Sequence, residues 1–299
     1  MPQIGKILIV SGTHGNEINP VWAVNQFCKQ DNITDNNIEY KFIIGNPLAF
    51  KKGIRYLDTD LNRSFDFKRN LDKKNYEFDR ANFLVNKFGI NSSDPCNIAI
   101  DLHTTTANMG TSVVMYGRRN VDFCLAALLQ HRFGLPIYLH ENDRNQKGFL
   151  VEAWPCGLVI EIGSVAQNFY DPNIVNRFLI IINDLRNEIN KLKHNLIKLP
   201  GELIVHVHQG SIDYPRDKNG NINGIIHPER INQDWEQIRR GDPLFLDING
   251  NTIFYRGDQD ICPVFIGEVA YKEKNIAMSY TRKEVIFSAE EWVKEFLSL

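Results

Sequence analysis

The first two thirds of the chain alternate short apolar runs with longer segments in which apolar residues recur every three or four positions. The short runs predict strands at residues 4–10, 40–44, 97–102, 111–116, 136–139 and 157–162. The periodic segments predict helices at residues 20–29, 73–88, 121–132 and 171–193. Strands that alternate with helices in this way are typical of an α/β fold with a parallel or mixed central sheet.

The pattern changes after the Leu-Pro-Gly sequence at residues 199–201. From there, short apolar runs at residues 202–209, 224–228, 243–248 and 251–255 are separated by turn sequences, and helical periodicity returns only at residues 289–297. We therefore expect two domains: an α/β domain over residues 1–199 and a smaller β-rich domain over residues 200–299.

Composition and charge narrow the classes of function. The chain has 299 residues, 43% of them apolar, and a net charge of −2, so no basic excess indicates nucleic acid as a partner. No apolar run approaches the roughly 20 residues that a membrane-spanning helix needs. The cysteine count is five, which is odd, and no Cys-x-x-Cys pair occurs, so a reducing compartment is favoured over a disulfide framework. These features predict a cytoplasmic protein without a nucleic-acid or membrane partner.

Polar residues cluster where the apolar runs of the α/β half end. His14 and Glu17 follow the first run, and Asp101 and His103 lie at the end of a later one. Two imidazoles and one carboxylate suit Zn²⁺ with an open fourth position, which is the catalytic arrangement. Asp101 precedes His103 by two residues and is placed to accept a hydrogen bond from a ligand imidazole. The alternative is a turn histidine, a helix-capping Glu17 and a strand-end Asp101.

A second group of charges suggests what such a metal would serve. Glu161 interrupts an apolar run, where a carboxylate is costly unless it is paired, and a desolvated Glu is suited to take a proton from water. Arg55 and Arg63 follow the second strand; one could stabilise an oxyanion and the other, with Asn62, could bind a carboxylate. The alternatives are a strand-end Glu that reaches solvent and a salt-bridged surface loop.

Other histidines carry less weight. His206 and His208 alternate along an apolar run, which indicates one face of a strand rather than metal ligands. His131, His140 and His194 are expected at the surface.

Several motifs together resemble one family. They are SGTHGNE, GNP, RYLDTDLNRSF, DLHTTTANMG and VIEIG in the first part of the chain, and DYPRDKNGNINGIIHPERINQDW, RRGDPLF and PVFIGEVAYKEK in the second. This ordered set resembles the zinc amidohydrolases that include aspartoacylase and succinylglutamate desuccinylase, and it covers most of the chain. The resemblance implies a zinc-carboxypeptidase-like α/β domain with a central mixed sheet, followed by a β-rich domain that helps to close the active-site channel.

The resemblance also implies roles for individual residues. One Zn²⁺ per subunit would be held by His14, Glu17 and His103, and Glu161 would activate water. Arg55 would polarise the scissile carbonyl, and the substrate carboxylate would be bound by three residues, Asn62, Arg63 and Tyr271. The implied reaction is hydrolysis of a small N-acyl amino acid, typified by N-acetyl-L-aspartate giving acetate and L-aspartate, and a homo-oligomer fits the resemblance.

Two positions depart from the family pattern. Phe149 lies near the position where the family carries an Arg, and Asn275 stands where it carries a Lys that would bind a second substrate carboxylate. Lys147, Arg144 or Lys274 could replace these cations from shifted positions. The alternatives are an aminoacylase for aromatic or apolar substrates, a desuccinylase, or a catalytically silent metal-binding protein.

Overall fold

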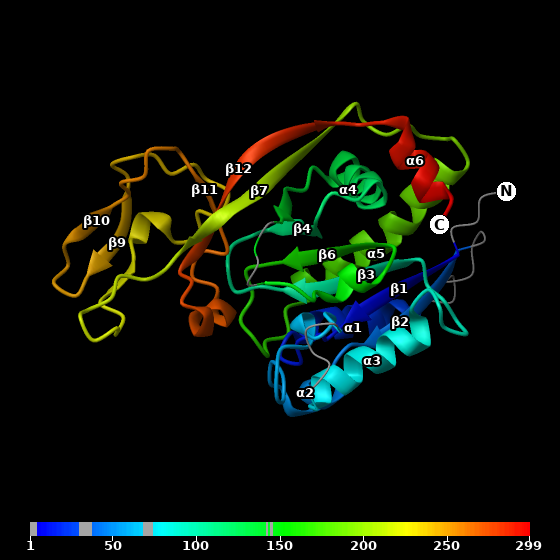
Figure 1. Ribbon diagram of the computed structural model, residues 1–299, viewed down its shortest axis with the longest axis horizontal. Helices are drawn as coiled ribbons and strands as arrows, with labels where there is room; N and C mark the ends of the chain where they lie inside the picture. Colours follow the sequence, from blue (N-terminus) through cyan, green and yellow to red (C-terminus); the bar gives the residue numbers. More distant parts are fainter. Residues whose placement is uncertain (1–4, 30–37, 68–73, 142, 144–145) are drawn as a thin grey trace.

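The fold is built around one large mixed sheet (Figure 1). The computed structural model describes residues 5–29, 38–67, 74–141, 143 and 146–299. The nine strands, in spatial order, are β11 (Cys262–Val264), β12 (Met278–Phe287), β7 (Glu202–Ile212), β5 (Ile137–His140), β4 (Thr111–Tyr116), β6 (Cys156–Ile162), β3 (Ile98–Thr104), β1 (Lys6–Ser11) and β2 (Glu39–Ile44).

Strand directions explain why the polar residues meet. β1, β2, β3 and β6 pair in parallel, so their carboxyl ends lie at one edge of the sheet. In this register His103 of β3 lies opposite Glu161 of β6. β4 pairs antiparallel with β6, and β12 pairs antiparallel with β7, which confirms the expected mixed sheet.

Helices cover both faces of the sheet. One core joins Ile7 and Ile9 to α1 (Ile18–Phe27), α4 (Asn120–Phe133), α5 (Pro172–Lys193) and α6 (Glu290–Leu297). The other core joins Leu8 and Val10 to α3 (Tyr76–Phe88). Because alternate residues of β1 enter different cores, this strand reads as a continuous apolar run.

The last hundred residues contribute to two sheets. A separate three-stranded sheet contains β10 (Thr252–Phe254), β9 (Pro243–Asp247) and β8 (Gly224–Ile226). β7 and β12 run side by side from the large sheet toward it, as Figure 1 shows in yellow-green and red. α6 packs against α4 of the first half. The division at residues 199 and 200 falls between α5 and β7 and stays a prediction.

Short elements account for most differences from the predicted pattern. The sequence analysis missed α2 (Pro47–Lys52), β11 and β12, as well as the single turns η1 (Leu61–Arg63), η2 (Leu150–Ala153), η3 (Pro228–Arg230) and η4 (Val269–Lys274). Asn46 caps α2 by accepting a hydrogen bond from the backbone of Ala49. The predicted positions 4 and 73 lie outside the described residues. Among the described helices, none combines the length and the apolar character that crossing a bilayer requires.

Candidate active site

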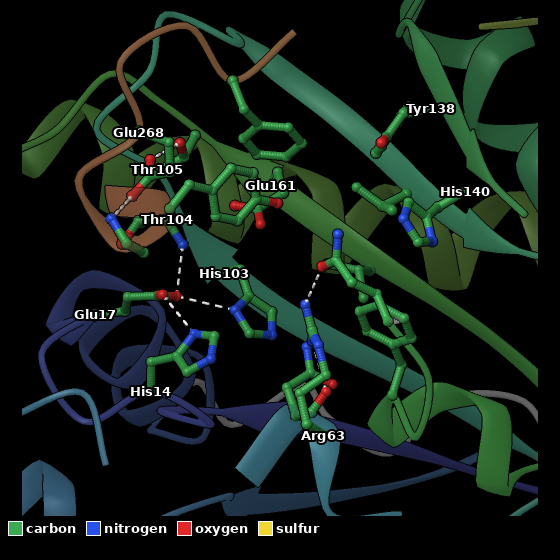
Figure 2. A pocket seen from close by; sticks show the side chains of 18 of the residues that line it. His14, Glu17, Arg63, His103, Thr104, Thr105, Tyr138, His140, Glu161 and Glu268 are labelled. Atoms are coloured by element: carbon green, nitrogen blue, oxygen red, sulfur yellow. Dashed lines mark hydrogen bonds and ion pairs between the residues drawn. The ribbon is translucent and has the colours of Figure 1, made fainter. Parts of the chain in front are cut away.

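Three buried side chains form the centre of the site. His14 and Glu17 lie in the turn between β1 and α1, and His103 lies in β3. Glu17 Oε1 is 2.6 Å from His14 Nδ1, and Glu17 Oε2 is 3.0 Å from His103 Nδ1 (Figure 2). The backbone N–H of Thr104 also donates a hydrogen bond to Glu17 Oε2, at 3.0 Å. One ligand atom from each of the three residues lies within 4.8 Å of the other two, which is a spacing that could hold a metal ion.

The far nitrogens of both imidazoles are held by carboxylates. His103 Nε2 lies 2.7 Å from Asp101 Oδ2, so the contact expected for Asp101 is confirmed. Thr13 donates a hydrogen bond to the other oxygen of Asp101. His14 Nε2 lies 3.0 Å from Asp60 Oδ1, a partner that the sequence analysis did not assign to it. With Nε2 engaged on each ring, both Nδ1 atoms face Glu17, which is how carboxylate–histidine pairs orient metal ligands.

The ionisation state of Glu17 suits a metal ligand. Burial works against ionisation of Glu17, but the imidazoles of His14 and His103 more than offset it and hold the pKa of Glu17 well below its usual range. Glu17 therefore stays a carboxylate, the form that ligates metals.

Glu161 lies at the end of β6 and points into the same space (Figure 2). Burial is the main cause that raises its pKa, to about 8; Glu17 and Glu268 add to the rise, while His103 and Arg55 oppose it. Its Oε2 atom is buried and has no hydrogen-bond partner among the described residues. A buried carboxyl group with a pKa near neutrality can both accept and deliver a proton.

The loop after α2 brings in the first guanidinium. Arg55 lies 3.5 Å from Glu17 Oε1 through Nη1 and 3.4 Å from Asp60 Oδ2 through Nη2. Its Nε atom is buried without a partner among the described residues. Arg55 is thus held by acidic neighbours in the pocket wall.

Asn62 and Arg63 belong to η1 in the same loop. The side-chain oxygen of Asn62 accepts a hydrogen bond from the backbone of Leu150, at 2.8 Å. Arg63 donates to Gln146 Oε1 at 2.9 Å, and its guanidinium lies 3.9 Å above the centre of the Phe149 ring. These contacts fix the Arg63 side chain in the pocket wall.

A segment from the last third of the chain closes one side of the pocket. Glu268 accepts hydrogen bonds from the backbone and hydroxyl of Thr106 and from the hydroxyl of Thr105, just beyond β3. Its other oxygen accepts from the backbone of Ala270 and so caps η4, which carries Tyr271. Glu268 therefore attaches the Tyr271 segment to the end of β3.

One pocket collects every residue that the sequence analysis assigned to the metal, to catalysis or to the substrate. The pocket opens to solvent, and these eight residues line it: His14, Glu17, Arg55, Asn62, Arg63, His103, Glu161 and Tyr271. Their convergence is observed, whereas their roles stay predictions.

Comparison with known proteins places the chain in a family. Residues 3–189 match the family described as "Succinylglutamate desuccinylase/Aspartoacylase catalytic domain", and residues 201–283 match the "AstE/AspA barrel-sandwich hybrid domain". A relative from Prochlorococcus marinus (strain MIT 9515) named "Probable aspartoacylase" is 72% identical over 295 residues, covering 98% of this chain and 99% of the relative. The chain belongs to the succinylglutamate desuccinylase/aspartoacylase family.

More distant similarities agree with this family. A "Probable aspartoacylase" from Prochlorococcus marinus (strain NATL2A) is 45% identical and covers 98% of this chain and 97% of its own length. The crystal structure of murine aminoacylase 3 has a TM-score of 0.87 at 27% identity and covers 96% of this chain and 98% of its own. Succinylglutamate desuccinylase from Vibrio cholerae shares the fold, with a TM-score of 0.64 at 16% identity over 95% of this chain and 85% of its own. As a member of this family the chain is an enzyme, an amidohydrolase, with the expected α/β catalytic fold.

The two positions that depart from the family pattern have different surroundings. Phe149 lines the pocket and stacks on Tyr116, with ring centroids 3.6 Å apart. Asn275 is exposed, and its side-chain oxygen accepts a hydrogen bond from Arg216. Lys274, by contrast, has a buried Nζ atom without a hydrogen-bond partner among the described residues. Lys147 is exposed, and Arg144 lies outside the described residues.

Some pocket residues were missed from the sequence. His140 was expected at the surface, but it is 7% exposed and lines the pocket, so that prediction was wrong. Tyr116, Tyr138 and Glu268 also line the pocket and received no role. His140 lies at the end of an apolar strand, and the same position at a strand end was the signal that identified His103.

Proposed function

We propose that this amidohydrolase uses a single zinc ion to hydrolyse the amide bond of a small N-acyl amino acid, with N-acetyl-L-aspartate as the leading substrate. The observation that carries the proposal is the convergence of His14, Glu17 and His103 beside Glu161, whose carboxyl group has a pKa near neutrality. Murine aminoacylase 3 and the relatives named aspartoacylase support the reaction class.

The donor set fits zinc. Two imidazoles and one carboxylate are a known catalytic zinc set, in which a fourth position is left to water or substrate. The buried Glu161 Oε2 atom without a partner among the described residues fits a group that acts on such a water. When bound, the ion would polarise the substrate carbonyl and acidify water. His14, Glu17 and His103 would hold it.

The remaining residues have separate roles. Glu161 takes a proton from the attacking water and delivers it to the nitrogen of the departing amine. Arg55 donates hydrogen bonds to the carbonyl oxygen, on which negative charge develops. Asn62, Arg63 and Tyr271 bind the α-carboxylate of the substrate, and Arg63 is held for this by Gln146 and Phe149.

A second substrate carboxylate would need its own cation, and we assign this role to Lys274, whose neighbour Tyr271 lines the pocket. Burial, with further contributions from Arg63 and other neighbours, lowers the pKa of Lys274 to about 8. Its Nζ atom lies 5.4 Å from the centre of the Tyr271 ring. An aspartate side chain would give this buried ammonium the hydrogen bonds and counter-charge that favour its ionised form. Lys274 thus replaces the cation missing at Asn275.

One observation favours a second candidate function, an aminoacylase for aromatic or apolar substrates. Part of the pocket wall is apolar, with Phe149 stacked on Tyr116 and with Val114 and Phe265 nearby in the lining. An apolar side chain would pack there without a cation.

A panel of N-acyl amino acids tests both functions. Purified enzyme is stripped with a chelator, reconstituted with one equivalent of zinc, and assayed for release of free amino acid from N-acetyl-aspartate, N-acetyl-leucine, N-acetyl-phenylalanine and N-succinyl-glutamate. We expect hydrolysis only after reconstitution and the highest kcat/KM for N-acetyl-aspartate. A preference for N-acetyl-phenylalanine would select the second candidate, and a metal-loaded enzyme that cleaves none of the four would refute the proposal.

The base is tested separately. Glu161→Gln should retain the metal and lose about 10²- to 10⁴-fold in kcat, which is the usual contribution of a general base. Glu202→Gln, an exposed carboxylate at the start of β7, serves as the control and should match the wild type. Full turnover by Glu161→Gln would show that another group moves the proton.

A further inference from the structure

A second group of metal-type donors includes one residue of the pocket lining, His140. His140 ends β5, Asp143 follows in the next loop, and His208 lies in β7. One ligand atom from each lies within 4.8 Å of the other two. Figure 2 places His140 across the pocket from His14 and Glu17. The group is therefore separate from the centre described above.

Strand pairing brings the two histidines together. β5 and β7 run parallel, with Tyr138 opposite His206 and Leu139 opposite Val207. The next step in this register places His140 beside His208, and their ring centroids are 4.8 Å apart. The sheet itself, rather than a flexible loop, thus fixes two of the three donors.

Hydrogen bonds orient two of the donors. The hydroxyl of Tyr138 lies 2.7 Å from His208 Nδ1, which leaves Nε2 of that ring for a ligand. Gln146 donates to Asp143 Oδ2 at 3.1 Å. Such outer contacts typically fix the ring and carboxylate orientations of a metal site.

The spacing suits an ion better than a direct contact. His140 Nε2 is 3.7 Å from Asp143 Oδ2, which is too long for a hydrogen bond. Ligand atoms about 2.1 Å from a tetrahedral zinc ion are about 3.4 Å apart. The His140–Asp143 pair is close to that value, and all three ligand atoms lie within 4.8 Å of one another.

We propose that His140, Asp143 and His208 form a second binding site for a divalent transition-metal ion of the zinc class. The site rests on its own three ligands and does not depend on the proposed function. It lies beside the residues proposed to bind substrate, because Gln146 contacts both Asp143 and Arg63.

Cobalt titration of the metal-free protein tests the proposal. Co²⁺ is added stepwise, binding is followed by visible absorption of the bound ion, and stoichiometry is checked by elemental analysis after dialysis. All samples carry Cys28→Ser, which removes the exposed thiol as an accidental ligand. We expect two equivalents per chain in this background.

Variants assign the second equivalent. Asp143→Asn changes only one loop carboxylate and should reduce binding to one equivalent. His208→Ala, made separately, should do the same. Tyr138→Phe should keep the site but weaken its affinity about 10-fold, as loss of an outer contact does. His206→Ala lies two residues away on the same strand and is the matched control, which should retain both equivalents.

A primary-site variant separates this proposal from the proposed function. His103→Ala should lose the other equivalent and keep the one that depends on Asp143. The proposal is overturned if the Cys28→Ser protein binds a single equivalent that only His103→Ala removes, or if Asp143→Asn and His208→Ala both retain two.

Discussion

The raised pKa of Glu161 predicts how the stability of the metal-free enzyme depends on pH. The folded-state pKa is about 8, against 4.5 for an unperturbed glutamate. Because the folded state keeps the proton to higher pH, this group stabilises the fold below pH 4.5, and the contribution is lost as pH rises through 8. At 1.36 kcal/mol per pKa unit, the full contribution is about 5 kcal/mol, of which about 3 kcal/mol is lost between pH 5.5 and 8.5.

Glu161→Gln removes this titration and is the perturbation to make. Urea unfolding of wild type and variant, both with a chelator, gives the free energy of unfolding at several values between pH 5.5 and 8.5. Relative to the variant, the wild type should lose about 3 kcal/mol over that interval. Glu202→Gln is the control and should follow the wild type.

The comparison between variants isolates Glu161, because the other groups that titrate are present in both proteins. Parallel curves for wild type and Glu161→Gln would refute the assigned pKa, and with it the argument that this carboxyl group is desolvated. Zinc should reduce the difference, since a nearby cation favours the carboxylate and draws its pKa down.

Three further predictions concern the residues around the centre. Glu268→Gln should lower the free energy of unfolding by about 1–3 kcal/mol and raise KM more than it lowers kcat, since it detaches the Tyr271 segment from β3; an unchanged KM would contradict this. Lys274→Met should reduce kcat/KM for N-acetyl-aspartate at least about 10-fold while sparing N-acetyl-leucine, and equal losses on both substrates would exclude a role in selectivity. Asp101→Asn should weaken zinc affinity about 10- to 100-fold in competition with a chelating dye, and an unchanged affinity would show that the contact with His103 is dispensable.

The sequence was most informative where chemistry and strand ends coincide. Glu161 was identifiable because a carboxylate inside an apolar run has few structural explanations, and His103 because it ends a buried strand. Both residues lie where parallel strands deliver them to one edge of the sheet. The main strands and helices of the first half were predictable from apolar periodicity, because each buries a continuous face in the core.

Features that depend on contacts between distant segments of the chain were not predictable from the sequence. β12 alternates buried and exposed residues only over part of its length and carries Arg282, Lys283 and Glu284 in its middle, so its apolar pattern is weak. Glu268 lies in an ordinary polar stretch, and its value as a connection arises only because β3 ends beside it. His140 was placed at the surface because nothing local shows that β7 pairs beside β5 in the sheet.

The placement of carboxylates supports the proposed metal ion at this centre. Glu17, Asp60, Asp101 and Glu161 converge from separate stretches of the chain, whereas Arg55 is the one permanent positive charge that contacts any of them among the described residues. Without a metal, the excess is relieved by protons: burial opposes a charge on His103, but Asp101 and Glu17 raise its pKa well above the usual value, and Glu161 stays protonated to about pH 8. A divalent ion would replace those protons, so its binding should release protons and strengthen as pH rises. The same excess of acid that is costly in the metal-free fold would therefore favour binding of a divalent cation at the proposed site.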